Sequence, residues 1–136
     1  MADRDLTALV ATFDERWNAR DEEGVLDFFT DDAVVRTTPP LPGGPEAFNG
    51  KEEIRQGFVR PLIPGFHVDS RNHRVEGNKV TWDSTLESDA LGQMGVDRAE
   101  TTTEANFRGD KIEAFYPTFS SETVARMQEA MGGAGT

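Results

Sequence analysis

Residues 79–88 have the sequence KVTWDSTLES, in which buried-type and polar side chains alternate. One face would carry Val80, Trp82 and Ser84, and the other would carry polar residues such as Asp83. A period of two is the pattern of a β-strand with one face in the protein interior and one in solvent. We therefore expect a strand from Lys79 to Ser88, with the indole of Trp82 pointing inward.

The same period continues on both sides of this strand. Residues 66–75 form the expected preceding strand, and Gly77-Asn78 is a two-residue hairpin signal. Residues 98–108 and 111–119 form two more expected strands, joined by a turn at Gly109-Asp110. Four consecutive strands, of which the first two and the last two are joined by tight turns, predict an antiparallel sheet.

The residues before this sheet have helical spacing instead. A first helical face carries five large apolar residues: Leu6, Leu9, Val10, Phe13 and Trp17. A short second helix is expected around Val25 to Phe29. A third is expected at Lys51 to Val59, ended by Pro61 and Pro64.

The remaining segments connect these elements. A short strand is expected at Ala33 to Thr37. Residues 38–45 and 90–97 are rich in Pro or Gly and are expected to be loops. A short C-terminal helix follows Ser120, and residues 132–136 are expected to be a disordered tail.

This order of elements predicts an α+β fold in a single domain spanning residues 1–136. We expect a curved antiparallel sheet wrapped by three N-terminal helices into a cone-shaped barrel, with a short C-terminal helix. A cone of this kind has an apolar interior in which a small ligand can lie.

Composition excludes several classes of function. The chain has 136 residues, no Cys, and 14 Lys+Arg against 25 Asp+Glu, for a net charge of −11. Such an acidic chain does not suit nucleic-acid backbones or anionic membrane surfaces, and disulfides and Cys-based metal sites are absent. No apolar run is long enough to span a membrane, and the polar N-terminus does not resemble a secretory signal, so we expect a cytoplasmic protein.

Four motifs in order resemble the nuclear transport factor two-like superfamily, and most closely its SnoaL-like and ketosteroid-isomerase-like members. They are NARD (18–21), FFTDDAVV (28–35), FNGKEEI (48–54) and RGDKI (108–112). The resemblance covers nearly the whole chain, from Leu6 to Met131. It implies the cone-shaped fold, and it implies a homodimer that assembles through the sheet. It does not fix one activity, because this superfamily contains isomerases, cyclases, epoxide hydrolases and non-catalytic binding domains.

The catalytic positions of ketosteroid isomerase do not transfer to this chain. The resemblance places its oxyanion tyrosine on Phe13, its general base on Thr37 and its protonated acid near Thr103. Threonine hydroxyls are not bases near neutral pH, so steroid isomerisation by that mechanism is not expected. The acidic residues of limonene epoxide hydrolase and of SnoaL-type cyclases have no match either.

The expected concave face is aromatic and hydroxylic. The residues that we expect to bind a ligand are Phe13, Trp17, Thr37, Phe58, Trp82, Ser84, Thr103, Phe115 and Phe119. These side chains are also the type that fills a core, and packing alone stays an open alternative. Inward hydroxyls favour a cavity, because each would need a hydrogen-bond partner there.

Three titratable residues are candidates for catalysis. Asp83 and Glu104 lie within strands and would enter the cavity if the register were shifted by one residue. His67 lies at the start of a long strand, and a straight strand would place His73 on the same face. These two imidazoles make a poor metal signature, and we expect no metal and no cofactor.

These patterns predict a SnoaL-like domain with a pocket for a small hydrophobic molecule. An isomerase, cyclase or epoxide hydrolase would act by general acid–base catalysis without a cofactor. The alternatives are a non-catalytic small-ligand carrier and a protein-interaction domain that uses the exposed face of the sheet. An enzyme and a non-catalytic domain both stay open on the sequence.

Overall fold

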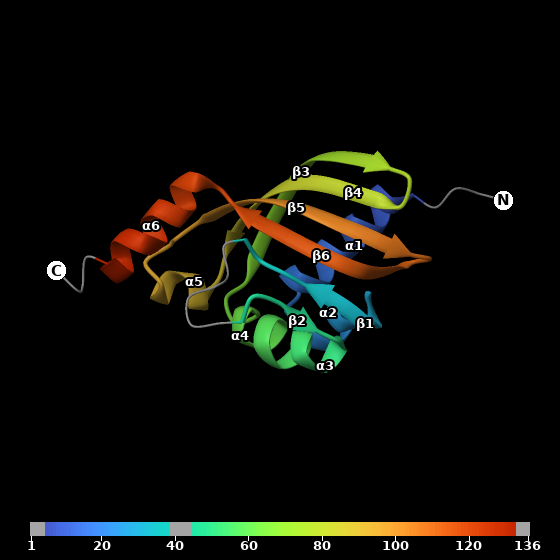
Figure 1. The fold of residues 1–136 in the computed structure, drawn as a ribbon, viewed down its shortest axis with the longest axis horizontal. Helices are drawn as coiled ribbons and strands as arrows, with labels where there is room; N and C mark the ends of the chain where they lie inside the picture. Colours follow the sequence, from blue (N-terminus) through green and yellow to red (C-terminus); the bar gives the residue numbers. More distant parts are fainter. Residues whose placement is uncertain (1–4, 39–44, 133–136) are drawn as a thin grey trace.

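A computed structural model describes residues 5–38 and 45–132, in which one six-stranded sheet is flanked by helices (Figure 1). The strands are β1 (Phe29–Val35), β2 (Phe48–Asn49), β3 (His67–Glu76), β4 (Lys79–Glu87), β5 (Ala99–Arg108) and β6 (Lys111–Phe119). Their order in the sheet is β2-β1-β6-β5-β4-β3, and β1 pairs with β6 in parallel. The sheet is therefore mixed, whereas the four long strands β3 to β6 are antiparallel as expected.

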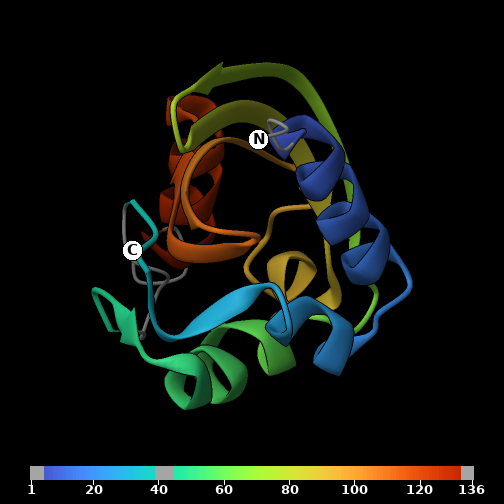
Figure 2. The ribbon, with the colours of Figure 1, turned by 90° about the vertical axis from the view of Figure 1, so that its right-hand side faces the viewer.

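The sheet is curved but does not close into a barrel. Its two edges are β2 and β3, which are not paired with each other. Figure 2 shows an arc from β3 through β6 to β1, with α1 (Leu6–Asn18) beside the β3 end. The predicted cone-shaped barrel is thus wrong, because a helix rather than a strand pairing covers the open side of the arc.

The helices also differ in part from the expected three. The described helices after α1 are α2 (Glu22–Leu26), α3 (Lys51–Ile54), the π-helical turn η1 (Arg55–Val59), α4 (Arg60–Leu62), α5 (Asp89–Gln93) and α6 (Ser121–Gly132). Only α1 is long among those before the sheet. Pro61 lies within α4 instead of ending the helix before it, at a first-turn position where a missing N–H is tolerated.

The segment expected to be a loop at residues 90–97 is helical in its first half, where α5 extends to Gln93. Ser88 caps this helix, because its hydroxyl accepts a hydrogen bond from the backbone N–H of Leu91 at 3.2 Å. Leu91 is 1% exposed and joins a small second core with α6 through Met127. Of the expected loop at 38–45 and the expected tail at 132–136, residues 39–44 and 133–136 lie outside the described residues, and Gly132 ends α6.

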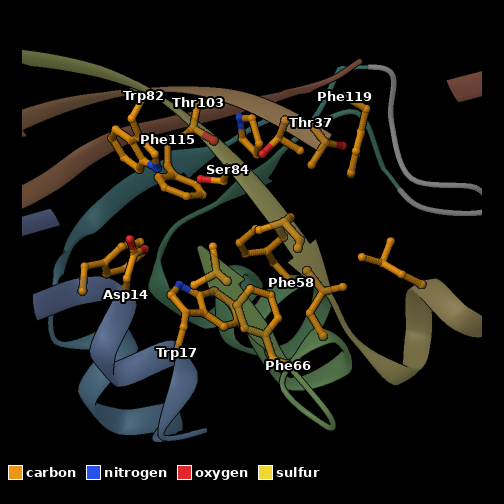
Figure 3. A pocket seen from close by; sticks show the side chains of 17 residues that line it. Asp14, Trp17, Thr37, Phe58, Phe66, Trp82, Ser84, Thr103, Phe115 and Phe119 are labelled. Atoms are coloured by element: carbon orange, nitrogen blue, oxygen red, sulfur yellow. The ribbon is translucent and has the colours of Figure 1, made fainter. Parts of the chain in front are cut away.

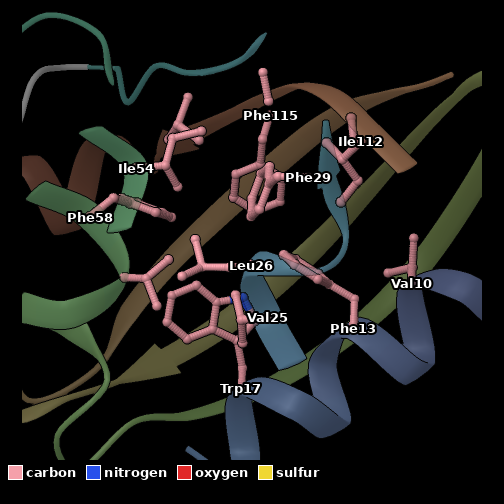
Figure 4. Packing of buried hydrophobic residues seen from close by; sticks show 14 of the residues in the cluster. Val10, Phe13, Trp17, Val25, Leu26, Phe29, Ile54, Phe58, Ile112 and Phe115 are labelled. Atoms are coloured by element: carbon pink, nitrogen blue, oxygen red, sulfur yellow. The ribbon is translucent and has the colours of Figure 1, made fainter. Parts of the chain in front are cut away.

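The ring of Phe13 joins α1 to the main core (Figure 4). This ring makes edge-to-face contacts with Trp17 and with three further rings, of Phe28, Phe29 and Phe115, at centroid distances of 5.4–6.3 Å. Such contacts add to the free energy of burying apolar area. The aromatic spacing of the first helix therefore fixes how α1 lies against the sheet.

A β-bulge separates the faces of the two histidines. The register of β3 against β4 shifts between Arg71 and Arg74, and Asn72 has a φ of 60°. An extra residue in one strand reverses the direction of the side chains beyond it. His67 is exposed while His73 stacks on Trp82, so the expectation of a shared face is wrong.

The side chain of Asn18 connects the end of α1 to the edge strand β3. Its Nδ2 donates to the carbonyl of Val68 at 3.1 Å, and its Oδ1 accepts from the N–H of Val68 at 2.7 Å. This amide thus pairs with the open edge as another strand would. It therefore holds α1 in place against β3, with Phe13 and Trp17 facing the concave side of the sheet.

We expect Asn18→Ala to lower the free energy of unfolding by about 1–3 kcal/mol, because two hydrogen bonds in a partly buried place are lost. Urea denaturation followed by circular dichroism measures this change. The control is Gln128→Ala on the exposed side of α6, where we expect almost no change. Equal stability of the two variants would contradict a holding role for Asn18.

Candidate functional site

A cavity of about 50 Å³ lies between α1 and the concave face of the sheet, with α4 and α5 at one end (Figure 3). All nine residues expected to bind a ligand lie in its wall: Phe13, Trp17, Thr37, Phe58, Trp82, Ser84, Thr103, Phe115 and Phe119. Eight more residues complete the wall: Asp14, Leu62, Phe66, Val68, Leu86, Leu91, Thr101 and Pro117. That the nine bind a ligand remains a prediction.

Alternation along the strands explains the composition of this wall. On β4, Trp82 and Ser84 are each 2% exposed. On β5, Thr101 and Thr103 are 4% and 3% exposed. Trp82 pairs with Thr103 and Ser84 with Thr101 across the two strands, so the two inward rows lie side by side.

Asp14 is the one ionisable residue among the described residues that line the cavity. It comes from α1, one residue after Phe13 and three before Trp17, and burial raises the pKa of its carboxyl to about 6. A hydrogen bond from Ser70 opposes this rise, and the nearby charge of Asp69 adds to it. Near neutral pH, this carboxyl group can therefore both accept and donate a proton.

Two serines connect Asp14 to the middle of the cavity wall. Ser70 on β3 faces Ser84 on β4, and their hydroxyl oxygens are 3.0 Å apart. If the Ser70 hydroxyl donates to Asp14, its oxygen accepts from Ser84. In this arrangement the hydrogen bond from Ser70 orients the carboxylate of Asp14.

The end of the cavity away from Asp14 carries hydroxyl groups. In Figure 3, Asp14 and Thr37 lie on opposite sides of the cavity, with Ser84 and Phe115 between them. The Oγ1 atoms of Thr37 and Thr101 are buried, and neither has a hydrogen-bond partner among the described protein groups. The cavity is therefore polar at both ends and aromatic between them.

The three expected catalytic candidates do not line the cavity. Asp83 lies on the outer face of the sheet, where hydrogen bonds from Asn72 and Thr102, both at 2.9 Å, lower the pKa of its carboxyl. Glu104 is half-buried on the same face, opposite Thr81. His67 is exposed, with its Nε2 3.4 Å from a carboxylate oxygen of Asp69. The strand register that places Trp82 inward thus places the carboxylates of Asp83 and Glu104 on the outer face.

His73 is a titratable side chain behind the cavity wall. Its ring is stacked on Trp82 at a centroid distance of 6.0 Å, and its buried Nε2 has no partner among the described protein groups. Burial lowers the pKa of this imidazole. It is therefore neutral beside Trp82 near neutral pH.

The described residues offer no ready metal site and no membrane span. Nowhere in residues 5–38 and 45–132 do three His, Asp or Glu side chains come together as metal ligands would. None of the helices in the described part of the chain has the length and apolar content needed to cross a bilayer.

A family model for the SnoaL-like domain matches residues 9–116, which is most of the chain. The chain belongs to the SnoaL-like domain family. No curated protein sequence matches it.

Solved structures show the same fold at low sequence identity. An NTF2-like protein of unknown function from Cytophaga hutchinsonii is 10% identical with a TM-score of 0.70, and the match covers 91% of this chain and 97% of that one. A candidate isomerase from Bacillus subtilis is 16% identical with a TM-score of 0.72, covering 94% and 93%. A candidate ketosteroid isomerase from Kribbella flavida is 12% identical with a TM-score of 0.67, covering 85% and 78%. At these identities the likeness establishes the fold of this SnoaL-like domain.

The raised pKa of Asp14 makes the stability of the SnoaL-like domain depend on pH. The folded protein holds this proton more tightly than the unfolded chain, so the stabilisation present below about pH 4 is lost as pH rises through about 6. A shift from 3.8 to about 6 corresponds to at most about 3 kcal/mol. We therefore expect the unfolding free energy of Asp14→Asn, measured relative to wild type, to rise by up to this amount between pH 4 and pH 8. A difference that stays constant with pH would contradict a raised pKa.

Two neighbours of Asp14 should move its pKa in opposite directions. Ser70→Ala removes a hydrogen bond to the carboxylate and should raise the pKa of Asp14 further. Asp69→Asn removes a nearby negative charge and should lower it. In each variant, the unfolding free energy is measured as a function of pH. The midpoint of this pH dependence, compared with that of wild type, reports the shift in the pKa of Asp14. Shifts in the same direction would refute this assignment of causes.

Proposed function

We propose that this SnoaL-like domain binds a small, uncharged and mostly hydrophobic molecule in its cavity and transfers a proton on it, with Asp14 as the acid–base group. One observation carries the proposal: a single carboxyl group lies in a wall that is otherwise aromatic, aliphatic and hydroxylic. A partly desolvated acid costs stability, and carboxyl groups with a raised pKa concentrate at functional sites.

The chemistry follows from the surroundings of Asp14. As a carboxylate it removes a proton from the bound molecule, and as the resulting acid it returns the proton to another atom. Ser70 keeps the carboxylate oriented during both steps. The aromatic rings of the wall lower the polarity around Asp14, which strengthens the electrostatic effect of one charge.

An isomerase fits a single acid–base group better than the other expected activities. Removing a proton and returning it elsewhere needs one carboxylate, whereas opening an epoxide with water needs both an acid and a base. Two structures with the same fold are described as candidate isomerases, which supports this class as an analogy of fold. No cofactor is part of the proposal.

The ligand must widen the cavity as it enters. The present volume of about 50 Å³ has room for a few water molecules, whereas pockets for drug-sized ligands have about 300–1,000 Å³. Three leucine side chains in the wall, those of Leu62, Leu86 and Leu91, are the ones that we propose to shift by changing rotamer. A compact ring compound is therefore the proposed ligand.

A non-catalytic carrier would use the same cavity without Asp14 chemistry. A protein-interaction domain is less well supported, because Val75, at 49% exposure, is the one large hydrophobic residue exposed in the described part of the chain. A homodimer through the sheet, which the family resemblance implies, would need a mostly polar interface for the same reason.

A generic substrate tests for a base in the cavity wall without knowledge of the natural substrate. In 5-nitrobenzisoxazole, a base removes the proton on the ring carbon next to nitrogen while the N–O bond breaks, and the product is a coloured cyanonitrophenolate. We expect the wild type to accelerate this reaction, with a rate that rises through a midpoint near pH 6. Asp14→Asn should lower the rate about 100-fold or more, since it removes the base.

The matched control is Asp83→Asn, which removes a carboxylate on the outer face and should leave the rate unchanged. Equal rates for wild type and Asp14→Asn would contradict the acid–base role of Asp14. If the compound binds in the cavity without reacting, the carrier is the better description.

A further inference from the structure

The buried hydroxyls of Thr37 and Thr101 have no role in the proton transfer proposed above. These residues are 3% and 4% exposed, and their Oγ1 atoms lack partners among the described protein groups. An unsatisfied buried hydroxyl costs about 1–3 kcal/mol, and the large majority of buried polar side chains are paired. Two such groups in one cavity wall need an explanation.

Both threonines lie at the same end of β6. Thr38 forms a bridge with Thr118, and Thr101 pairs with the next residue of that strand, Phe119. Because β6 runs between them, Thr37 and Thr101 lie on the two sides of this strand where it lines the cavity. Pro117 lines the cavity between them and adds no donor, so the donors of this part of the wall are hydroxyl groups, those of Thr37, Thr101 and Thr103.

We infer that Thr37 and Thr101 form a subsite for an uncharged oxygen, a hydroxyl or a carbonyl group, on an otherwise apolar ring ligand. This inference rests on the proposed ligand-binding function and adds the substrate class to it. The ligand would lie with its oxygen at the threonine end, its ring against Phe58 and Phe115, and its reactive proton at the Asp14 end.

Charge on the protein explains why the oxygen is neutral. Asp14 is the ionisable group of the described cavity wall and lies at the other end, and the chain as a whole has a net charge of −11. An anion at the threonine end would have no counter-ion, and a cation would be drawn to Asp14 instead. A hydroxyl group both donates and accepts, so threonine can bind either form of neutral oxygen.

The test compares p-cresol with toluene, which differ by one hydroxyl group. Binding to the full chain is measured by chemical-shift titration of the ¹⁵N-labelled protein. We expect Thr37→Val and Thr101→Val each to weaken p-cresol binding about 3- to 10-fold, the effect of one neutral hydrogen bond, with toluene affinity unchanged. Valine keeps the shape and removes an unpaired hydroxyl, so neither variant should unfold more easily.

Thr118→Val on the exposed outer face is the matched control and should change neither affinity. Equal weakening of both compounds, or unchanged p-cresol binding, would overturn the oxygen subsite while leaving the apolar cavity and the role of Asp14 intact. If neither compound binds to the wild type, the proposed ligand-binding function falls together with the subsite.

Discussion

The fixed position of α1 across the open side of the curved sheet is the constraint on which the site depends. Asn18 pairs with the backbone of edge strand β3, and Phe13 packs among four aromatic rings. Asp14 is three residues before Trp17 and four before Asn18, so helical geometry places it on the same face of α1 as these two residues, on the side of the cavity. The interactions that hold the fold together therefore also bring a carboxyl group into an apolar wall.

Burial of that carboxyl group links stability to function. Desolvation disfavours the charged form of Asp14, and the hydrogen bond from Ser70 offsets only part of this effect. The unpaired hydroxyls of Thr37 and Thr101 add a second local cost in the same cavity. A domain selected only for stability would replace all three side chains with apolar ones, whereas a binding site with a reactive group requires them.

The strand pattern was sufficient to predict most of the cavity wall. A period of two is a rigid geometric rule, so placing Trp82 inward also placed Ser84 and Thr103 inward, and Asp83 outward. Asp14 was missed because a charged residue at the border of a helical apolar stripe is normally solvated. Its spacing from Val10 and Trp17, four before and three after, was the signal that could have identified it.

Other features depended on interactions that a local pattern does not contain. The bulge at Asn72 turns His73 inward, and a one-residue insertion of this kind leaves no mark in the alternation of apolar residues. The open sheet and the parallel pairing of β1 with β6 depend on contacts between distant segments.

The ionisation of Asp14 is the most direct measure of whether this fold builds a reactive site. A carbon-13 NMR titration of its carboxyl group should give a pKa near 6, whereas a value near 4 would mean that the carboxylate is solvated and that the cavity has no acid–base group.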